Sequence, residues 1–388
     1  MTGIGMVFSR HLPACAAAFA LFATVGAPLQ AAAQDILIGV STPATGGAAI
    51  ASEREMQGVN LAVEEINAAG GVLGRKIKTM VLDNRCNPSE SVNVTNKLIE
   101  AKVVAIIGAH CSSASLAAMP LIKEAKIAMV GGIASSPRIT DLSGVGGNEW
   151  LFRTNPSDAD MMKALIGYLS EKNVFKKVAV IAEDSDFGRG GAGSFNELAK
   201  GTKLEVISTD YPPQNTPDFT SLLTRISRSK PDAIALFQLG GDQINLLRTS
   251  MQMGLRIPYT GRVELGGENM QFIKAGGIEK SISAWSYSTA VDAPTNKAFV
   301  EKVTAKYKLP PVLQTWSGYD NVRIIVQAIK EAGSDNSVKV RDALAKVKFQ
   351  TVMGPEVSFD DHNQAGKIVL IQEVKNKEIV IAAMVRNK

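Results

Sequence analysis

A run of serines opens a predicted helix near residue 112. The segment 111–115, Cys-Ser-Ser-Ala-Ser, directly follows a strand-like run at residues 103–108. The first N–H groups of a helix have no partner within the helix and carry a partial positive charge, and serine hydroxyls add further donors. This combination suits a carboxylate or another small anion. Helix capping by serine is the alternative interpretation for this segment alone.

A second donor-rich loop follows the next strand-like run, residues 127–131. Its sequence over residues 131–137 is Gly-Gly-Ile-Ala-Ser-Ser-Pro. Open α/β sheets bind ligands at the carboxyl ends of their strands. Two such loops on neighbouring strands therefore favour a binding site over simple capping.

The glycine run Gly188–Gly193 fits the pattern G-x-G-x-x-G and carries an alternative function, a dinucleotide-dependent oxidoreductase. Asp210, 17 residues beyond the run, lies near the expected position of a ribose-binding acid. However, residues 183–187 separate the preceding strand from the first glycine, whereas a pyrophosphate-binding turn follows its strand directly. A glycine-rich helix entrance is the favoured interpretation.

The residues of catalysis and metal binding are sparse. The sequence contains neither G-x-S-x-G nor H-E-x-x-H, and beyond residue 33 it has two histidines, His110 and His362. We expect His110 to be a solvated loop residue, although it follows a strand and could edge a cleft. We therefore expect no enzyme activity, no metal and no cofactor.

Short β-branched runs alternate with amphipathic segments from residue 35 onward, which predicts parallel α/β units. In the first unit, the expected strands lie at 35–41, 76–82, 103–108 and 127–131, and the helices near 53–69, 88–102 and 113–125. The segment 52–55 predicts a capping box before the first helix, and Pro120 predicts a kink or break in the third.

The same alternation restarts after a polar bridge at residues 153–158. Expected strands lie at 177–182, 204–208, 232–238 and 282–287, and expected helices near 158–172, 188–200, 217–229, 242–254 and 267–276. The last third predicts helices near 294–308, 312–332 and 337–346, then strands at 355–359, 367–374 and 378–384. Residues 360–366 predict a hairpin turn between the first two of these strands. This order suggests that the chain returns to both units.

Composition limits the class of protein. The 388 residues are 45% hydrophobic and 20% charged and include 34 glycines, too apolar for a disordered chain and too glycine-rich for a coiled coil. The net charge of +5 comes from 42 basic and 37 acidic residues without a basic block, so we expect no nucleic-acid partner.

The N-terminal segment predicts export. Arg10 precedes a short apolar run at residues 15–27, and Ala31–Ala33 fits a small-residue cleavage site. We expect a signal peptide over residues 1–33, cleaved after Ala33, and a periplasmic mature protein. Cys86 and Cys111 then lie in an oxidising compartment, which favours one disulfide between them over two free buried thiols.

The sequence resembles the leucine/isoleucine/valine-binding protein family, the extracytoplasmic receptors of ABC importers, over essentially all of the mature chain. The motifs that carry the resemblance are Leu61–Gly71, Asp83–Pro88, Gly108–Ser113, Leu151–Thr154 and Thr351–Pro355. The resemblance implies a type I periplasmic-binding-protein fold, in which two α/β lobes, each a parallel-sheet sandwich, are joined by three hinge crossings. The implied N-terminal lobe is 34–154 plus 287–352, and the C-terminal lobe is 155–286 plus 353–388.

The family's function implies a monomer that binds a hydrophobic, branched-chain-type amino acid and delivers it to a membrane ABC permease. A sensory receptor of the same fold is an open alternative. The family also links the two cysteines that Cys86 and Cys111 match.

The family's ligand contacts carry over residue by residue. Ser112, with Ser113 beside it on the helix N-terminus, would bind the ligand carboxylate. Ser135 would add a hydroxyl, and the Ile133 backbone would contact the ammonium group. An aromatic on the opposite lobe matches Phe187. The acidic partner of the ammonium group matches Glu264, with Val263 competing for that position.

Three departures from the family change the expected pocket. Ala51, Phe187 and Leu239 stand where relatives that bind aliphatic amino acids often have tyrosines. We expect a larger, drier pocket that is poorer in hydrogen-bond donors. If Glu264 does not point inward, the expected ligand is an aromatic or other apolar carboxylate without an amino group, because a buried ammonium needs an acceptor.

Overall fold

The computed structural model describes residues 1–9, 34–366 and 368–386. The chain divides into two units, residues 1–33 and residues 34–388. Of the first unit, residues 1–9 are described; they are exposed and form neither helix nor strand. The apolar run and cleavage site predicted for the signal peptide fall outside the described residues.

The N-terminal lobe is built on a parallel five-stranded sheet of order β2-β1-β3-β4-β5. In register, Ile36 pairs with Ile77 and Thr42 pairs with Asp83. The elements in chain order are β1 (Ile36–Thr42), α1 (Ala49–Ala68), β2 (Ile77–Asp83), α2 (Pro88–Glu100), β3 (Ala105–Ile107), α3 (Ser112–Ala125), β4 (Ala128–Gly131), α4 (Pro137–Leu142) and β5 (Leu151–Arg153).

The C-terminal lobe repeats this plan with a parallel sheet of order β7-β6-β8-β9. Its elements are α5 (Asp158–Lys172), β6 (Lys177–Ala182), α6 (Asp186–Ala199), β7 (Glu205–Asp210), α7 (Thr220–Arg228), β8 (Ala233–Phe237), α8 (Gly240–Gln252), β9 (Tyr259–Gly261), the 3-10 helix η1 (Gly267–Asn269), α9 (Met270–Lys274) and β10 (Ile282–Trp285).

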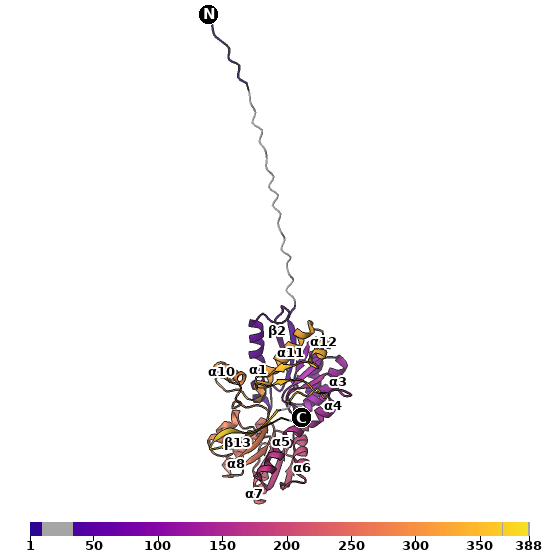
Figure 1. Ribbon diagram of the computed structural model, residues 1–388, viewed down its shortest axis with the longest axis vertical. Helices are drawn as coiled ribbons and strands as arrows, with labels where there is room; N and C mark the ends of the chain where they lie inside the picture. Colours follow the sequence, from indigo (N-terminus) through magenta and orange to yellow (C-terminus); the bar gives the residue numbers. More distant parts are fainter. Residues whose placement is uncertain (10–33, 367, 387–388) are drawn as a thin grey trace. The chain divides into compact units, whose positions relative to one another are not determined.

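The last third of the chain supplies both lobes, as the sequence suggested (Figure 1). It comprises α10 (Pro294–Tyr307), α11 (Leu313–Ala332), α12 (Ser337–Leu344), β11 (Phe349–Gln350), β12 (Glu356–Val357), β13 (Ile368–Lys375) and β14 (Glu378–Arg386). Helix α11 packs on α1, where glycines at 58 and 318 leave room for the facing backbone. Strand β13 pairs with β10 and β14 and contacts α5. The chain therefore crosses between the lobes three times, after β5, after β10 and before β13.

Each sheet has a hydrophobic core on both faces. In the N-terminal lobe, one core gathers α1 and α11, and the other gathers α2 and α3. In the C-terminal lobe, one core includes α5 and α6, and the other includes α7 and α8. These layers confirm the predicted two-lobed α/β sandwich.

Two local predictions are wrong, the capping box at 52–55 and the hairpin at 360–366, and of the kink or break predicted at Pro120 the break does not form. Helix α1 begins at Ala49, so Ser52 lies inside the helix, buried, and accepts a hydrogen bond from Thr42 Oγ1 at 2.8 Å. Helix α3 continues through Pro120, since Ala118 and Ile122 pack in the core on both sides of it. The predicted hairpin at 360–366 does not form.

The reason for the missing hairpin lies in what the two strands pair with. Strand β12 pairs with β11, and β13 pairs with β10 and β14. Gln364, which lies in the expected turn, instead forms a parallel β-bridge with Arg153 of β5. The Arg153 Nε also donates to Gln364 Oε1 at 2.5 Å.

Candidate functional site

A cavity lies at the carboxyl ends of both parallel sheets. The order of each sheet places its topological switch point there, between β1 and β3 in one lobe and between β6 and β8 in the other. The structure brings every proposed ligand-binding residue to this cavity: Ala51, Ser112, Ser113, Ile133, Ser135, Phe187, Leu239 and Glu264.

The N-terminus of α3 forms one wall of the cavity. Cys111 is the N-cap residue and makes no side-chain cap hydrogen bond, so the helix end is left for another acceptor. Ser112 is buried, and its Oγ accepts a hydrogen bond from the Ser136 backbone N–H at 3.1 Å. Ser113 Oγ accepts from the Asp186 N–H of the opposite lobe at 3.1 Å. A carboxylate at this helix end would meet serine hydroxyls and backbone donors together.

A disulfide joins Cys86 to Cys111, with 5.4 Å between their Cα atoms. This confirms the predicted pairing. Because Cys111 is the N-cap of α3 and both cysteines line the cavity, the bridge ties this helix end to the segment between β2 and α2.

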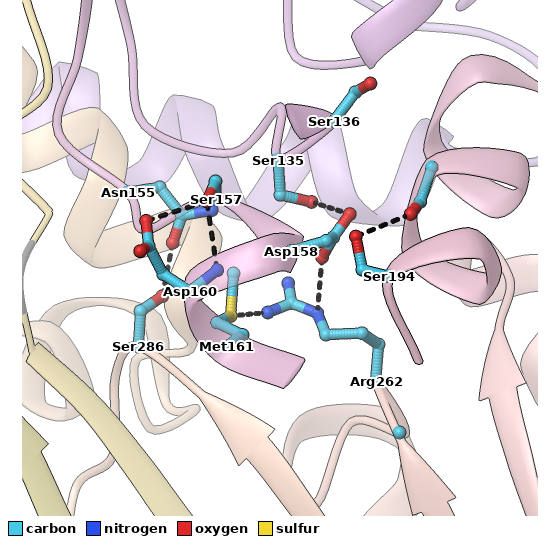
Figure 2. Close-up of polar contacts among 12 residues, drawn as sticks. Ser135, Ser136, Asn155, Ser157, Asp158, Asp160, Met161, Ser194, Arg262 and Ser286 are labelled. Carbon is cyan, nitrogen blue, oxygen red and sulfur yellow. Dashed lines mark hydrogen bonds and ion pairs between the residues drawn. The ribbon is translucent and has the colours of Figure 1, made fainter. Parts of the chain in front are cut away.

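Ser135 lies at the junction of the two lobes (Figure 2). Its hydroxyl donates to Asp158 Oδ2 at 3.0 Å, and Arg262 Nε lies 3.4 Å from Asp158 Oδ1. Burial raises the pKa of Asp158 to about 6, with Arg262 and the Ser135 hydroxyl opposing this shift. Since its hydrogen is directed to Asp158, the Ser135 hydroxyl has only acceptor capacity left for another group.

Ile133 lines the cavity, and its carbonyl oxygen accepts from Asn155 Nδ2 at 3.2 Å. A carbonyl has two lone pairs, so it retains capacity for a second donor. Ile133 and Ser135 thus present acceptors from the loop that follows β4.

Val263 and Glu264, the two candidates for the acidic position, lie in different environments. Val263 is fully buried in the hydrophobic core of the C-terminal lobe, whereas Glu264 lines the cavity. Burial raises the pKa of Glu264 to about 8, and the like charge of Glu268 adds to the shift, while Arg54 and Arg262 oppose it. Glu264, and not Val263, therefore lies on the cavity wall, in the lobe opposite α3.

The opposite lobe contributes an apolar surface. Phe187 lies in the first turn of α6, and Leu239 is the N-cap of α8. Trp285 also lines the cavity, with the Arg262 guanidinium carbon 4.4 Å from its ring centroid.

Residues 35–378 match the model of the periplasmic binding protein family. The chain belongs to this family. A leucine-, isoleucine-, valine-, threonine- and alanine-binding protein of Pseudomonas aeruginosa PAO1 is 27% identical over 345 residues, which are 88% of this chain and 91% of the relative. These findings confirm the resemblance predicted from the sequence motifs.

Solved periplasmic binding proteins share the fold. The branched-chain amino acid transporter substrate-binding protein of Streptococcus pneumoniae, in complex with isoleucine, is 28% identical, with a TM-score of 0.81 over 91% of this chain and 100% of its own. A solute-binding protein of Rhodopseudomonas palustris BisB5, in complex with 3,4-dihydroxybenzoic acid, is 23% identical, with a TM-score of 0.81 over 91% of this chain and 97% of its own. At this lower identity the second likeness establishes the fold.

Several residues at the cleft of this periplasmic binding protein were missed by the sequence prediction. They are Glu183, Gln214, Gln238, Gln243, Arg262, Trp285 and Gln314, and they are joined by His110, for which the cleft was the less favoured of two interpretations. The amide and guanidinium groups among them add polar atoms to the wall, although Gln214 and Gln243 already donate to protein acceptors, and the expectation of a pocket poor in hydrogen-bond donors stays a prediction. The spacing of isolated glutamines gives no periodic signal that would have marked them.

Two of these residues are buried acid–base groups. The prediction that His110 is a solvated loop residue is wrong. Its side chain is buried, and its Nδ1 lies 2.8 Å from Glu55 Oε2. Burial raises the pKa of Glu183, whose carboxylate accepts from Ser185 Oγ at 2.6 Å, Gln214 Nε2 at 3.0 Å and the Leu239 N–H at 2.8 Å. Glu183 thereby links the loops that carry Phe187 and Leu239.

The glycine run of this periplasmic binding protein forms no turn. Gly188–Gly193 lie inside α6, and Ser185 caps the helix by accepting from the Gly188 N–H at 3.2 Å. A Cβ on Gly188 would lie 2.0 Å from the Glu183 carbonyl oxygen, and one on Gly191 would lie 2.4 Å from the Phe237 ring. The glycines therefore allow α6 to approach β6 and β8.

Within residues 1–9, 34–366 and 368–386, no helix has the length and apolarity to cross a membrane. The same described residues contain no cluster of three or more His, Cys, Asp or Glu side chains suited to a metal ion.

Proposed function

We propose that this protein is the extracytoplasmic solute-binding component of an ABC transporter and binds a hydrophobic amino acid between its two lobes. One observation carries the proposal: the N-terminus of α3 with Ser112 and the carboxyl of Glu264 line the same cavity. A helix N-terminus stabilises a carboxylate, and a carboxylate partner stabilises an ammonium group. The Pseudomonas relative binds leucine, isoleucine, valine, threonine and alanine, and the Streptococcus relative is in complex with isoleucine, which supports the same ligand class.

The work of the protein is then binding, lobe closure and docking on a membrane permease, and not catalysis. We place the lobe boundaries at 34–154 plus 287–352 and at 155–286 plus 353–388. Ligand contacts that span both lobes favour the closed state, because only that state makes all of them. We further propose export by a signal peptide at residues 1–33 with cleavage after Ala33, which N-terminal sequencing of the mature periplasmic protein tests.

A second candidate ligand is an aromatic or other apolar carboxylate without an amino group. Phe187, Leu239 and Trp285 provide an apolar wall, and with a pKa raised to about 8 the Glu264 carboxyl is largely neutral at pH 7 in the unliganded protein. A neutral carboxyl requires no cationic partner.

A thermal-shift screen of ligand-free protein tests the proposal. A ligand that binds the native state raises its stability, by about 2.7 kcal/mol at a concentration of 100 times Kd. We expect stabilisation by an amino acid, and comparison of leucine with 4-methylpentanoate, which lacks its amino group, separates the two ligand classes. If neither amino acids nor aromatic acids raise the unfolding temperature while NAD(H) does, the transport proposal fails and the dinucleotide alternative replaces it.

A further inference from the structure

Four glutamines line the cleft, and two of them already have structural partners. Gln214 Nε2 donates to Glu183. Gln243 Nε2 donates to the Arg262 carbonyl oxygen at 3.3 Å, and its Oε1 accepts from the Glu264 N–H at 2.9 Å. These two amides hold the loops of the C-terminal lobe in place.

The other two glutamines, Gln238 and Gln314, have no such role. Their side chains line the cavity and are 4% and 9% exposed. Within the part of the chain that the structure describes, the side-chain oxygen of each has no hydrogen-bond partner. Buried amides are normally paired, because an unpaired one loses its hydrogen bonds to water without replacement.

The two amides come from different lobes. Gln238 directly follows β8 of the C-terminal lobe, and Gln314 lies in the first turn of α11, which packs on α1 of the N-terminal lobe. A ligand group that bonds to both amides would therefore connect the two lobes. A ligand without that group would lose these hydrogen bonds and would also stabilise the closed state less.

We propose that Gln238 and Gln314 recognise a polar group at the far end of the ligand, one that both donates and accepts hydrogen bonds. This rests on the proposed function, in which the ligand's carboxylate binds at α3. A primary amide carries both a donor and an acceptor whichever way it is turned, so its natural complement is a carboxamide or a hydroxyl. The ligand is then an amino acid or related acid whose side chain is apolar along its length and polar at its end.

Selectivity follows from the cost of leaving these amides unpaired. A purely aliphatic side chain would keep both of them buried without partners. Sites built to hydrogen-bond a substrate group reject the analogue that lacks it far more strongly than apolar pockets reject an added hydroxyl. We expect a preference of at least about tenfold for the polar member of a shape-matched pair.

Calorimetric titration of ligand-free protein with four matched pairs tests this: leucine and asparagine, valine and threonine, phenylalanine and tyrosine, benzoate and 4-hydroxybenzoate. The wild type should bind the polar member more tightly in the pair that fits the cleft. Gln238→Met and Gln314→Met, which keep the side-chain length, should each reduce that preference at least about fivefold. Gln327→Met, on the same helix as Gln314 and bonded to Glu331 outside the cleft, should leave it unchanged.

Equal or tighter binding of the apolar member in every pair that binds would overturn the inference and leave the proposed function standing. A polar preference that survives in both folded Met variants would also overturn it. If all eight compounds fail to bind, the proposed function fails and the inference fails with it. If circular dichroism shows that a variant does not fold, the inference is decided by whether the wild-type protein prefers the polar member of the ligand pair that fits the cleft.

Discussion

Glu264 is the side chain on which the two ligand classes differ. It lines the cavity that also holds Ser112, and burial together with Glu268 raises its pKa to about 8. An amino acid would bring an ammonium group that favours the ionised carboxyl, whereas a simple carboxylate would not. Binding of an amino acid should therefore release a proton near neutral pH, and its affinity should rise between pH 6 and 8.5.

Replacement of Glu264 by Gln should weaken the binding of an amino acid more than the binding of a carboxylate that has no amino group. Leucine affinity should fall by at least about tenfold through loss of the charge partner, since hydrogen bonds to charged groups contribute about 1.5–3 kcal/mol. The affinity for 4-methylpentanoate should change less than about threefold, because that ligand has no ammonium group to lose its partner. Titration calorimetry of both ligands checks this, and an equal loss for the two would contradict the assigned role.

The same variant should gain stability at neutral pH when no ligand is present. The folded-state pKa of Glu264 lies above the ordinary value of 4.5, so the folded protein keeps a proton that the unfolded chain has released. Wild-type stability is therefore lost as pH rises from about 4.5 towards 8, by up to about 1.4 kcal/mol for each pKa unit of difference. Denaturant unfolding at pH 5 and pH 8 should show the gap between variant and wild type widening with pH.

At the scale of elements, α6 shows how one sequence pattern supports two interpretations. Its glycines fit a phosphate-binding motif, yet they lie within a helix, and Gly188 and Gly191 are needed for its close approach to the Glu183 backbone and to Phe237 of β8. Gly193 differs, because a Cβ there would meet no atom within 4 Å. The two kinds of glycine in one helix give a matched pair of substitutions.

Gly188→Ala should lower the free energy of unfolding by about 1–3 kcal/mol, since the added Cβ would collide with the Glu183 backbone. Gly193→Ala should raise it by up to about 1 kcal/mol, because glycine is the poorer helix former. Urea unfolding of both variants measures this. A destabilising Gly193→Ala or a neutral Gly188→Ala would contradict the packing account.

The sequence predicted most of the elements because their cores are periodic. Helix α5 and strand β6 have the predicted bounds, while the short strands β5 and β9 and helix α4 were not predicted. Three residues of strand carry too little alternation to be recognised, and their place is set by pairing with neighbours. Ser52, the predicted cap of α1, is instead bonded to Thr42 at the end of β1, a contact that its local sequence does not indicate.

The cleft was predictable where residues match a family motif and not elsewhere. All eight proposed ligand residues lie on its wall, as the resemblance implied, although their ligand contacts stay a prediction. Gln238 and Gln314 belong to no motif. They line the same cavity only because two lobes, built from distant parts of the sequence, meet there. Such residues become visible only in three dimensions.

At the scale of the whole molecule, the described lobes meet around the cleft. Arg54 Nη2 of α1 lies 2.5 Å from Glu268 Oε1 of η1, and Arg138 Nη1 lies 3.3 Å from Asp186 Oδ1. Gly190 of α6 faces Pro137 of the other lobe, where a Cβ would lie 3.0 Å from the proline Cδ. Gly190 therefore allows α6 to lie close to Pro137 of the other lobe.

Gly190→Leu should hold the lobes apart without disturbing either core. We expect ligand affinity to fall at least about tenfold. The apparent affinity falls in proportion to the fraction of protein that can reach the closed, binding-competent state, and Gly190→Leu should reduce that fraction. Small-angle scattering should show a radius of gyration that decreases on ligand addition in the wild type and in Gly193→Leu, but not in Gly190→Leu. A normal decrease in Gly190→Leu would contradict closure at this contact.

The central claim is that the N-terminus of α3 binds the carboxylate of a small ligand. Calorimetric titration of Ser112→Ala with the acid that most stabilises the wild type tests it most directly, with Ser227→Ala on α7 as control. We predict one site per chain in the wild type and control, and an affinity at least about tenfold lower in Ser112→Ala, as expected for a lost hydrogen bond to a charged group. An unchanged affinity in a folded Ser112→Ala protein would contradict the account.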